Sequence, residues 1–160
     1  MEGCAIDQVK FQSVKEQAEI FYSNIKEVHC PYLKSDVFFN AKGLEHLKFK
    51  SRNHARLQKD QYVRLRLISL APEILKLSHT VQGVQEAKSF ELEKMHSRWE
   101  RILRNVTYYE FIAVIRRVRI RVIVKQVENG PKYFWSIIPF WRMDTFTGER
   151  KIHNGRPEED

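Results

Sequence analysis

Alternating hydrophobic and polar residues predict that residues 107–141 form three consecutive antiparallel strands. If the first turn consists of Arg116-Arg117 alone, the pairing of the first two strands runs back to Tyr108 opposite Lys125. One face of this hairpin is then entirely apolar or aromatic, which suits packing against helices. The residues of that face are Tyr109, Phe111, Ala113, Ile115, Val118, Ile120, Val122 and Val124.

The other face of the same hairpin carries charge in its middle. Its residues are Tyr108, Glu110, Ile112, Val114, Arg119, Arg121, Ile123 and Lys125. Glu110 is expected diagonally between Arg121 and Lys125, so that one carboxylate lies in a basic field. A longer turn would shift the register and move these charges to the core face, because Arg-Arg is not an ideal pair for a tight turn. We expect the function on the charged face.

The first half of the chain is predicted to be mainly helical. Apolar spacing indicates an amphipathic helix from about Lys10 to Val28, an extra edge strand near residues 35–40, helices at Leu44 to Phe49 and Ala55 to Leu70, and a short helix from Pro72 to Leu77. Residues 78–106 mix Gln, Lys and Glu with a few large apolar side chains. We expect this stretch to be a helix or a mobile loop over the sheet, anchored by Trp99, Ile102 and Leu103.

The predicted fold class is α+β, with N-terminal helices packed on one face of a C-terminal antiparallel sheet of three to four strands. A chain of 160 residues that is 42% hydrophobic suits one domain, residues 1–160, with flexible ends at 1–9 and 143–160. The chain contains neither a long apolar run nor a signal peptide, so we expect a cytoplasmic protein without a membrane contact. Cys4 and Cys30 are interpreted as reduced thiols, with a disulfide between them as the alternative.

The net charge of +8 and the pI of about 9.6 favour an anionic partner such as RNA, although basic charge alone is a weak signal. The sequence has no glycine-rich phosphate loop, nucleophile elbow, HExxH, CxxC or paired acidic motif. This argues against an NTPase, a dinucleotide enzyme and an α/β-hydrolase, and we expect neither a metal nor a cofactor.

Cleavage of RNA without a metal needs a base for the 2′-hydroxyl, cations for the phosphorane and an acid for the leaving oxygen. Glu110 with Arg119, Arg121 and Lys125 suits the first two tasks. The alternative is a solvated face with ordinary cross-strand ion pairs. A two-residue turn at Asn129-Gly130 would add the Ser136 hydroxyl to this face, opposite Ile123, although an ordinary structural serine remains equally plausible.

Other candidate side chains lie outside the first two strands. His46 and His54 flank the basic residues Lys48, Lys50 and Arg52, and histidine is the natural acid or base near neutral pH. Surface or capping roles are the alternative for both histidines. Tyr108, Tyr133 and Trp141 lie at strand ends and are candidates for stacking on RNA bases.

Five short stretches follow one another in a characteristic order. They are Val37-Phe38-Phe39, Gly43-Leu44-Glu45-His46-Leu47, Asn53-His54-Ala55-Arg56, Ala71-Pro72-Glu73-Ile74 and Trp135-Ser136-Ile137-Ile138. With helices first and a basic sheet last, this order resembles the barnase, EndoU, colicin and RelE superfamily of small metal-independent ribonucleases, most closely its phage-derived branches. The resemblance covers roughly residues 37–141, and each motif is short.

The resemblance implies cleavage of RNA by 2′-hydroxyl attack, giving a cyclic phosphate without a metal. It makes His46 the acid or base, Arg56 and Arg121 phosphate clamps, Lys125 a transition-state cation and Ser136 a positioning hydroxyl. Arg52, His54, Arg56, Arg119 and Arg121 are the expected RNA-binding residues, and Glu110 is a further catalytic candidate. Two features depart from the family. No histidine directly follows the last strand, and residues 78–106 have no counterpart in the compact toxins.

The sequence therefore predicts an endoribonuclease of toxin or processing type. A non-catalytic RNA-binding module is one alternative. The other is a basic interaction protein that docks an acidic partner such as an antitoxin or inhibitor.

Overall fold

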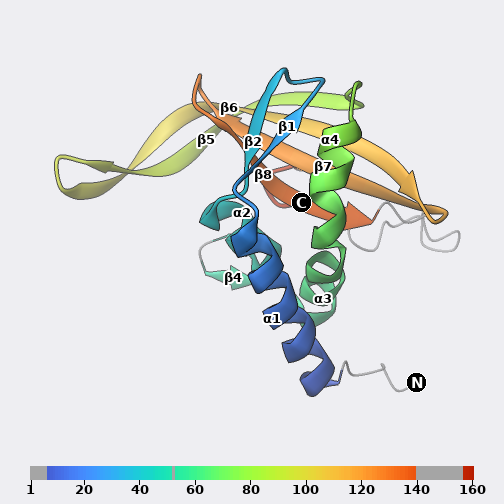
Figure 1. The fold of residues 1–160 in the computed structure, drawn as a ribbon. Helices are drawn as coiled ribbons and strands as arrows, with labels where there is room; N and C mark the ends of the chain where they lie inside the picture. The colour runs from blue at the N-terminus through green and yellow to red at the C-terminus, as the bar shows by residue number, and fades with distance from the viewer. Residues whose placement is uncertain (1–6, 52, 140–156) are drawn as a thin grey trace, which may run out of the picture.

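The computed structural model describes residues 7–51, 53–139 and 157–160. Helices and short strands come first, and long strands follow (Figure 1). The elements of the first part are α1 (Gln8–Asn24), β1 (Glu27–Cys30), β2 (Ser35–Phe38), α2 (Ala41–Lys48), β3 (Phe49–Ser51), β4 (His54–Ala55), α3 (Gln58–Leu67), the 3-10 helix η1 (Ile68–Leu70) and α4 (Ala71–Leu77). The elements of the second part are β5 (Gly83–Met95), β6 (Arg98–Ile115), β7 (Val118–Val127) and β8 (Lys132–Pro139).

The main sheet is larger than predicted. Among the described residues, six strands form one mixed sheet in the order β1-β2-β8-β7-β6-β5, and β3 and β4 form a separate two-stranded sheet. The pairing of β2 with β8 is parallel, and the other neighbours in the main sheet are antiparallel. The expectation of a purely antiparallel sheet of three to four strands is therefore wrong, although the protein does combine helices with a mostly C-terminal sheet.

One missed strand, β1, lies where the first helix was expected to continue. The helix α1 begins after Asp7, whose carboxylate accepts a hydrogen bond from the Val9 amide at 3.0 Å, and it ends at Asn24. Val28 fits the helical spacing of the residues before it, but Val28 and Cys30 alternate with exposed residues and are buried in β1. The Cys30 thiol is free, whereas Cys4 lies outside the described residues.

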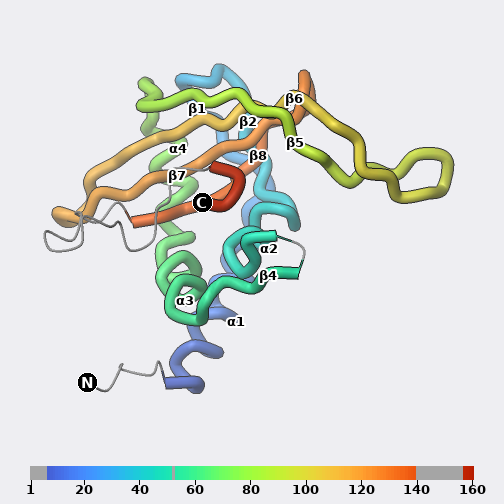
Figure 2. The backbone as a smooth tube through the Cα atoms, turned by 180° about the vertical axis from the view of Figure 1, so that it is seen from behind, coloured from blue at the N-terminus to red at the C-terminus, as the bar shows by residue number. Residues whose placement is uncertain are grey.

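The prediction of a helix or loop at residues 78–106 is also wrong. This stretch supplies β5 and the first part of β6, which form a long antiparallel hairpin that extends beyond the rest of the sheet (Figures 1 and 2). Charged residues such as Glu91 and Glu93 alternate with Phe90 and Leu92, which is the period of a strand. The pattern was hard to recognise because the apolar members of this alternation are exposed and do not form part of the core.

The register of the β6–β7 hairpin is as predicted. Tyr108 lies opposite Lys125, and the two turn residues, Arg116 and Arg117, have φ angles of 49° and 67°, as a tight type I′ turn requires. The apolar face of this hairpin contributes Phe111, Ile120, Val122 and Val124 to the main core. The helices cover this face, and Ala18, Leu47, Leu65 and Ile74 pack in the same core. None of the described helices is long and apolar enough to span a membrane.

The helices α2 and α3 lie beside one edge of β8. The strand β2 pairs with β8 only at Val37 with Lys132 and at Phe38 with Tyr133. Beyond these pairs α2 and α3 contact β8, and both views show them below this part of the sheet (Figures 1 and 2). This position lets side chains of both helical segments reach the charged face of the sheet.

Candidate functional site

A β-bulge in β8 places Trp135 and Ser136 next to each other on the charged side of the sheet. Val124 pairs with Phe134 and Ile123 pairs with Ser136, which leaves Trp135 as the extra residue. The predicted pairing of Ser136 with Ile123 is confirmed, but the two-residue turn that suggested it is not. Gln126 pairs with Lys132, which is one residue away from the expected register. The extra residue of the bulge then brings Ser136 opposite Ile123, as expected.

Two buried arginines share one carboxylate beside this bulge. Arg56 and Arg64 are 3% and 0% exposed. The Asp60 carboxylate lies 2.7 Å from Arg64 Nε and 3.5 Å from Arg56 Nη1. Burial lowers the pKa of both guanidinium groups, that of Arg56 to about 10. Arginine keeps its proton in proteins, so both groups are charged at neutral pH. Asp160 also favours the charged form of both arginines, so Asp60 and Asp160 together balance these two cations in the structure.

His46 lies against these arginines as a neutral acceptor. Its main-chain oxygen accepts a hydrogen bond from Arg56 Nε at 2.9 Å, and its Nε2 lies 3.0 Å from Arg56 Nη2. Arg56 is always a donor, so His46 Nε2 is the acceptor. Burial holds the pKa of His46 well below its usual value, and the positive charges of Arg56, Arg64 and Lys125 lower it further. The imidazole also stacks on the Trp135 ring, with 3.9 Å between the ring centroids.

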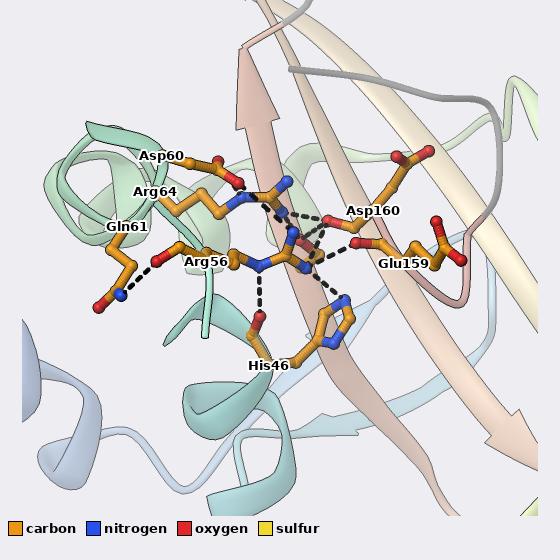
Figure 3. Close-up of polar contacts among 8 residues, drawn as sticks. His46, Arg56, Asp60, Gln61, Arg64, Glu159 and Asp160 are labelled. Atoms are coloured by element: carbon orange, nitrogen blue, oxygen red, sulfur yellow. Dashed lines mark hydrogen bonds and ion pairs between the residues drawn. The ribbon is translucent and has the colours of Figure 1, made fainter. Parts of the chain in front are cut away.

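We use the name oxyanion pocket for the cluster of buried side chains formed by His46, Arg56, Arg64 and Ser136. Main-chain oxygens of the segment 157–160 accept hydrogen bonds from this cluster (Figure 3). Arg64 Nη1 and Ser136 Oγ both donate to the main-chain oxygen of Asp160, the latter at 2.6 Å. Arg56 Nη2 donates to the main-chain oxygen of Glu159 at 2.7 Å and lies 3.5 Å from that of Asp160.

The segment 157–160 belongs to the predicted flexible end, yet Asp160 is only 2% exposed. The Trp135 indole also donates to it, at 2.9 Å from the main-chain oxygen of Pro157. Charged donors that converge on one oxygen are the arrangement that proteins use to bind carboxylates and phosphates. In this structure the main-chain oxygens of Glu159 and Asp160 are the acceptors on which these donors converge.

Lys125 lies next to Trp135, the residue on whose ring His46 stacks. Its Nζ is 2.6 Å from the Glu91 carboxylate and 4.2 Å from the centroid of the Trp135 ring. Burial lowers the pKa of Lys125, and the ion pair with Glu91 opposes this effect. Its neighbours across the sheet are Tyr108 and Tyr133, whose hydroxyl oxygens are buried and have no hydrogen-bond partner among the described residues. Burial raises the pKa of both tyrosines, so both stay neutral.

Glu110 was expected between two cations, Arg121 and Lys125, but the structure forms two separate ion pairs. Glu110 lies 2.9 Å from Arg121 Nε, whereas the carboxylate that pairs with Lys125 is Glu91. Arg121 was expected as a phosphate clamp, but it is paired with Glu110, and the arginine that accompanies Arg56 is Arg64.

The remaining predicted residues do not join the oxyanion pocket. His54 is exposed in β4, where its Nδ1 is 2.9 Å from the Ser51 hydroxyl. Arg119 is exposed near the Arg116-Arg117 turn. Arg52 and Trp141 lie outside the described residues.

Sequence reasoning missed four residues of this region: Arg64, Asp60, Trp135 and Glu91. A signal for two of them was present, because Asp60 and Arg64 are four residues apart and so share one side of α3, while Arg56 precedes this helix by two residues. Trp135 depends on the bulge, and Glu91 depends on the strand β5, so neither has a comparable local signal.

Comparison of the chain with protein-family models, with curated proteins and with solved structures finds no match. Within the described part of the chain, no three His, Cys, Asp or Glu side chains form a group that could hold a metal ion.

Proposed function

We propose that the protein is an endoribonuclease of toxin or processing type and that its oxyanion pocket binds the scissile phosphate. The observation that carries this proposal is the convergence of Arg56, Arg64 and Ser136 on one oxygen position, in contact with a neutral histidine. Two buried guanidinium groups match the charge of a phosphorane better than that of a single carboxylate. The net charge of +8 favours RNA as the source of the phosphate.

The proposed reaction uses the 2′-hydroxyl of the substrate as the nucleophile. Its oxygen bonds to phosphorus, the bond to the 5′-oxygen breaks, and the products are a 2′,3′-cyclic phosphate and a 5′-hydroxyl. His46 accepts the proton of the 2′-hydroxyl, because only a neutral imidazole can do so. Arg56 and Arg64 neutralise the phosphorane, and Ser136 orients it. Lys125, whose pKa burial lowers, gives a proton to the 5′-oxygen, and exchange with water restores both groups.

A second candidate is a protein that binds RNA in this pocket without cleaving it. It is favoured by two contacts of the proposed acid and base. His46 Nε2 accepts a hydrogen bond from Arg56, and Lys125 Nζ is paired with Glu91. Both groups must exchange these partners for substrate before they can transfer protons. The proposed cytoplasmic location suits either candidate, since each needs access to RNA.

The test is incubation of the protein with total RNA in EDTA, beside His46→Asn, Lys125→Met and Arg64→Gln. We expect discrete cleavage with 2′,3′-cyclic phosphate ends, reduced at least about 100-fold in each variant. His79→Asn is the matched control, because His79 is exposed and lies outside the pocket. Retarded but intact RNA in a gel would favour the binding protein. If RNA is neither cut nor retarded, both candidates fail and an acidic protein partner becomes the better hypothesis.

A further inference from the structure

The outer half of the β5–β6 hairpin forms an arm, which we define as residues 88–105. The pairing of β6 with β7 begins at Val106, so the arm extends beyond β7 as a two-stranded ribbon (Figures 1 and 2). Within the arm, β5 and β6 pair continuously from Lys88 with Asn105 to Met95 with Arg98. Paired residues share a face of the ribbon, so the register assigns every side chain to one of two faces.

The inner face of the arm is held by ion pairs. Glu91 reaches Lys125 of β7 at 2.6 Å, and Glu93 pairs with Arg104 across the ribbon at 2.9 Å. The contact with Lys125 ties the arm to the charged side of the sheet. All the carboxylates of the arm, those of Glu91, Glu93 and Glu100, belong to this inner face.

The outer face of the arm is apolar and basic and contains no carboxylate. Its residues are Lys88, Phe90, Leu92, Lys94, Trp99, Arg101, Leu103 and Asn105. The apolar side chains are largely exposed: 61% for Phe90, 65% for Trp99, 50% for Leu103 and 41% for Leu92. The three cations of this face are exposed as well. None of these four apolar side chains belongs to a hydrophobic core in the part of the chain that the structure describes.

We propose that the outer face of the arm binds single-stranded RNA, an inference that rests on the proposed function. Phe90 and Trp99 offer flat rings on which bases can stack, and they lie about four residues, or roughly 13 Å, apart along the ribbon. Lys88, Lys94 and Arg101 surround these rings and can contact the phosphates. The Arg101 guanidinium lies 5.9 Å from the centroid of the Phe90 ring, an arrangement that also suits stacking.

Charge selects RNA over a second copy of this chain. Two outer faces that meet would bring six cations together without a carboxylate, which opposes association. A polyanion whose bases have apolar faces complements both the charge and the rings. Exposed rings on a flat β-surface are also a common way to bind unpaired bases.

The outer face of the arm continues the face of β6 that carries Tyr109 and Phe111, so it lies on the opposite side of the sheet from Lys125 and the oxyanion pocket. The arm therefore offers a second contact for an RNA that is long enough to reach both sides of the sheet. The arm is therefore expected to increase the affinity for long single strands and to leave that for very short ones unchanged.

The experiment measures dissociation constants for 2′-O-methyl oligouridine of 20 and of 3 nucleotides, which cannot be cleaved through the 2′-hydroxyl. Phe90→Ser/Trp99→Ser is expected to bind the 20-mer at least about tenfold more weakly than the wild type and the 3-mer equally well. Lys88→Gln/Lys94→Gln/Arg101→Gln is expected to lower the slope of log affinity against log salt by about 2. The matched control is Lys10→Gln/Lys59→Gln/Lys76→Gln, which removes three exposed cations of the helices and should leave the slope nearly unchanged.

The outcomes separate this proposal from the proposed function. If the arm variants bind the 20-mer like the wild type while Arg64→Gln does not, the arm proposal is overturned and the pocket stands. Arm-dependent binding without any cleavage of RNA would support the arm and count against the ribonuclease. Loss of binding to phosphatidylglycerol vesicles, with RNA affinity unchanged, would assign the arm to a membrane surface instead. If the wild type binds no RNA, both proposals fail.

Discussion

Glu91 and Lys125 form an ion pair of 2.6 Å although their strands, β5 and β7, are separated in the sheet by β6. Their side chains are 11% and 4% exposed, so the pair is largely removed from water. The attraction offsets the cost of burying two charges, and loss of either partner leaves the other charge uncompensated. This contact fixes the arm relative to the charged face of the sheet.

Removal of the Glu91 charge should therefore destabilise the protein more than removal of an exposed charge. We expect Glu91→Gln to lower the free energy of unfolding by about 3 kcal/mol, and the double variant Glu91→Gln/Lys125→Met to recover most of this loss. Urea unfolding measures both changes. The control is Glu19→Gln, which breaks a more exposed pair with Lys48 and should cost less than about 1 kcal/mol. Equal effects of Glu91→Gln and Glu19→Gln would show that the Glu91–Lys125 pair does not form in solution.

The depressed pKa of His46 predicts a loss of stability in mild acid. The unfolded chain binds a proton on this histidine below its ordinary pKa of 6.5, whereas the folded chain does so only at a lower pH. The stabilising effect is complete above pH 6.5 and is lost as the pH falls towards the folded pKa, at up to about 1.4 kcal/mol per pH unit. Urea unfolding at pH 7, 6 and 5 should show this slope, and His46→Asn should flatten it. His79→Asn should keep the wild-type slope, and an unaltered slope in His46→Asn would contradict the assignment.

Gly43 should not tolerate a side chain, because α2 packs closely against β8 there. A Cβ at this position would overlap the main-chain oxygen of Phe134 and lie 2.6 Å from Tyr22 Oη. We expect Gly43→Ala to destabilise the protein by about 1–3 kcal/mol and to weaken RNA binding, since the displacement of α2 moves His46. In the control Gly83→Ala, the nearest atom is Glu110 Cβ at 3.5 Å, an ordinary contact, so stability should change little. Thermal unfolding of both variants tests the prediction, which fails if their melting temperatures agree.

The segment 157–160 should compete with any anion for the oxyanion pocket. The donors of Arg56, Arg64 and Ser136 that would hold a phosphate are engaged by main-chain oxygens of this segment. A variant that ends at residue 156 is therefore expected to bind a short 2′-O-methyl RNA several-fold more tightly, and to cleave unmodified RNA faster. Addition of a peptide with the sequence Pro-Glu-Glu-Asp should reverse the gain. Unchanged affinity after truncation would mean that the segment does not close the pocket in solution.

The part of the fold that the sequence predicted well depends on local pattern. The β6–β7 hairpin has uninterrupted alternation and a turn that fixes its register, so its two faces could be assigned residue by residue. The same reasoning failed for β5. On one face of this strand Phe90 and Leu92 are exposed to solvent, and on the other face Glu91 and Glu93 form ion pairs. Without a buried apolar face, strand periodicity in this segment does not stand out from a polar helix.

The candidate site was predicted in part. His46, Arg56, Ser136 and Lys125 were chosen from the charged face, the resemblance and the histidine positions, and the structure brings them together around Trp135. The contribution of Arg64 depends on the position of α3 beside β8, which is a tertiary relationship that local patterns do not encode. Glu110 was assigned to the same group because cross-strand neighbours are readable from the register, whereas the more distant Glu91 is not.

The short pairing of β2 with β8 has a consequence for the solubility of the protein. Beyond Tyr133, the edge of β8 that faces away from β7 is covered by α2 and α3 in the described part of the chain. Apart from Ser136, the residues of this edge from Phe134 to Ile138 are apolar and favour strands, and such an edge recruits strands from other molecules when it is uncovered. The helices that carry His46 and Arg64 therefore also act as a guard against aggregation, so loosening them for function carries a risk of self-association.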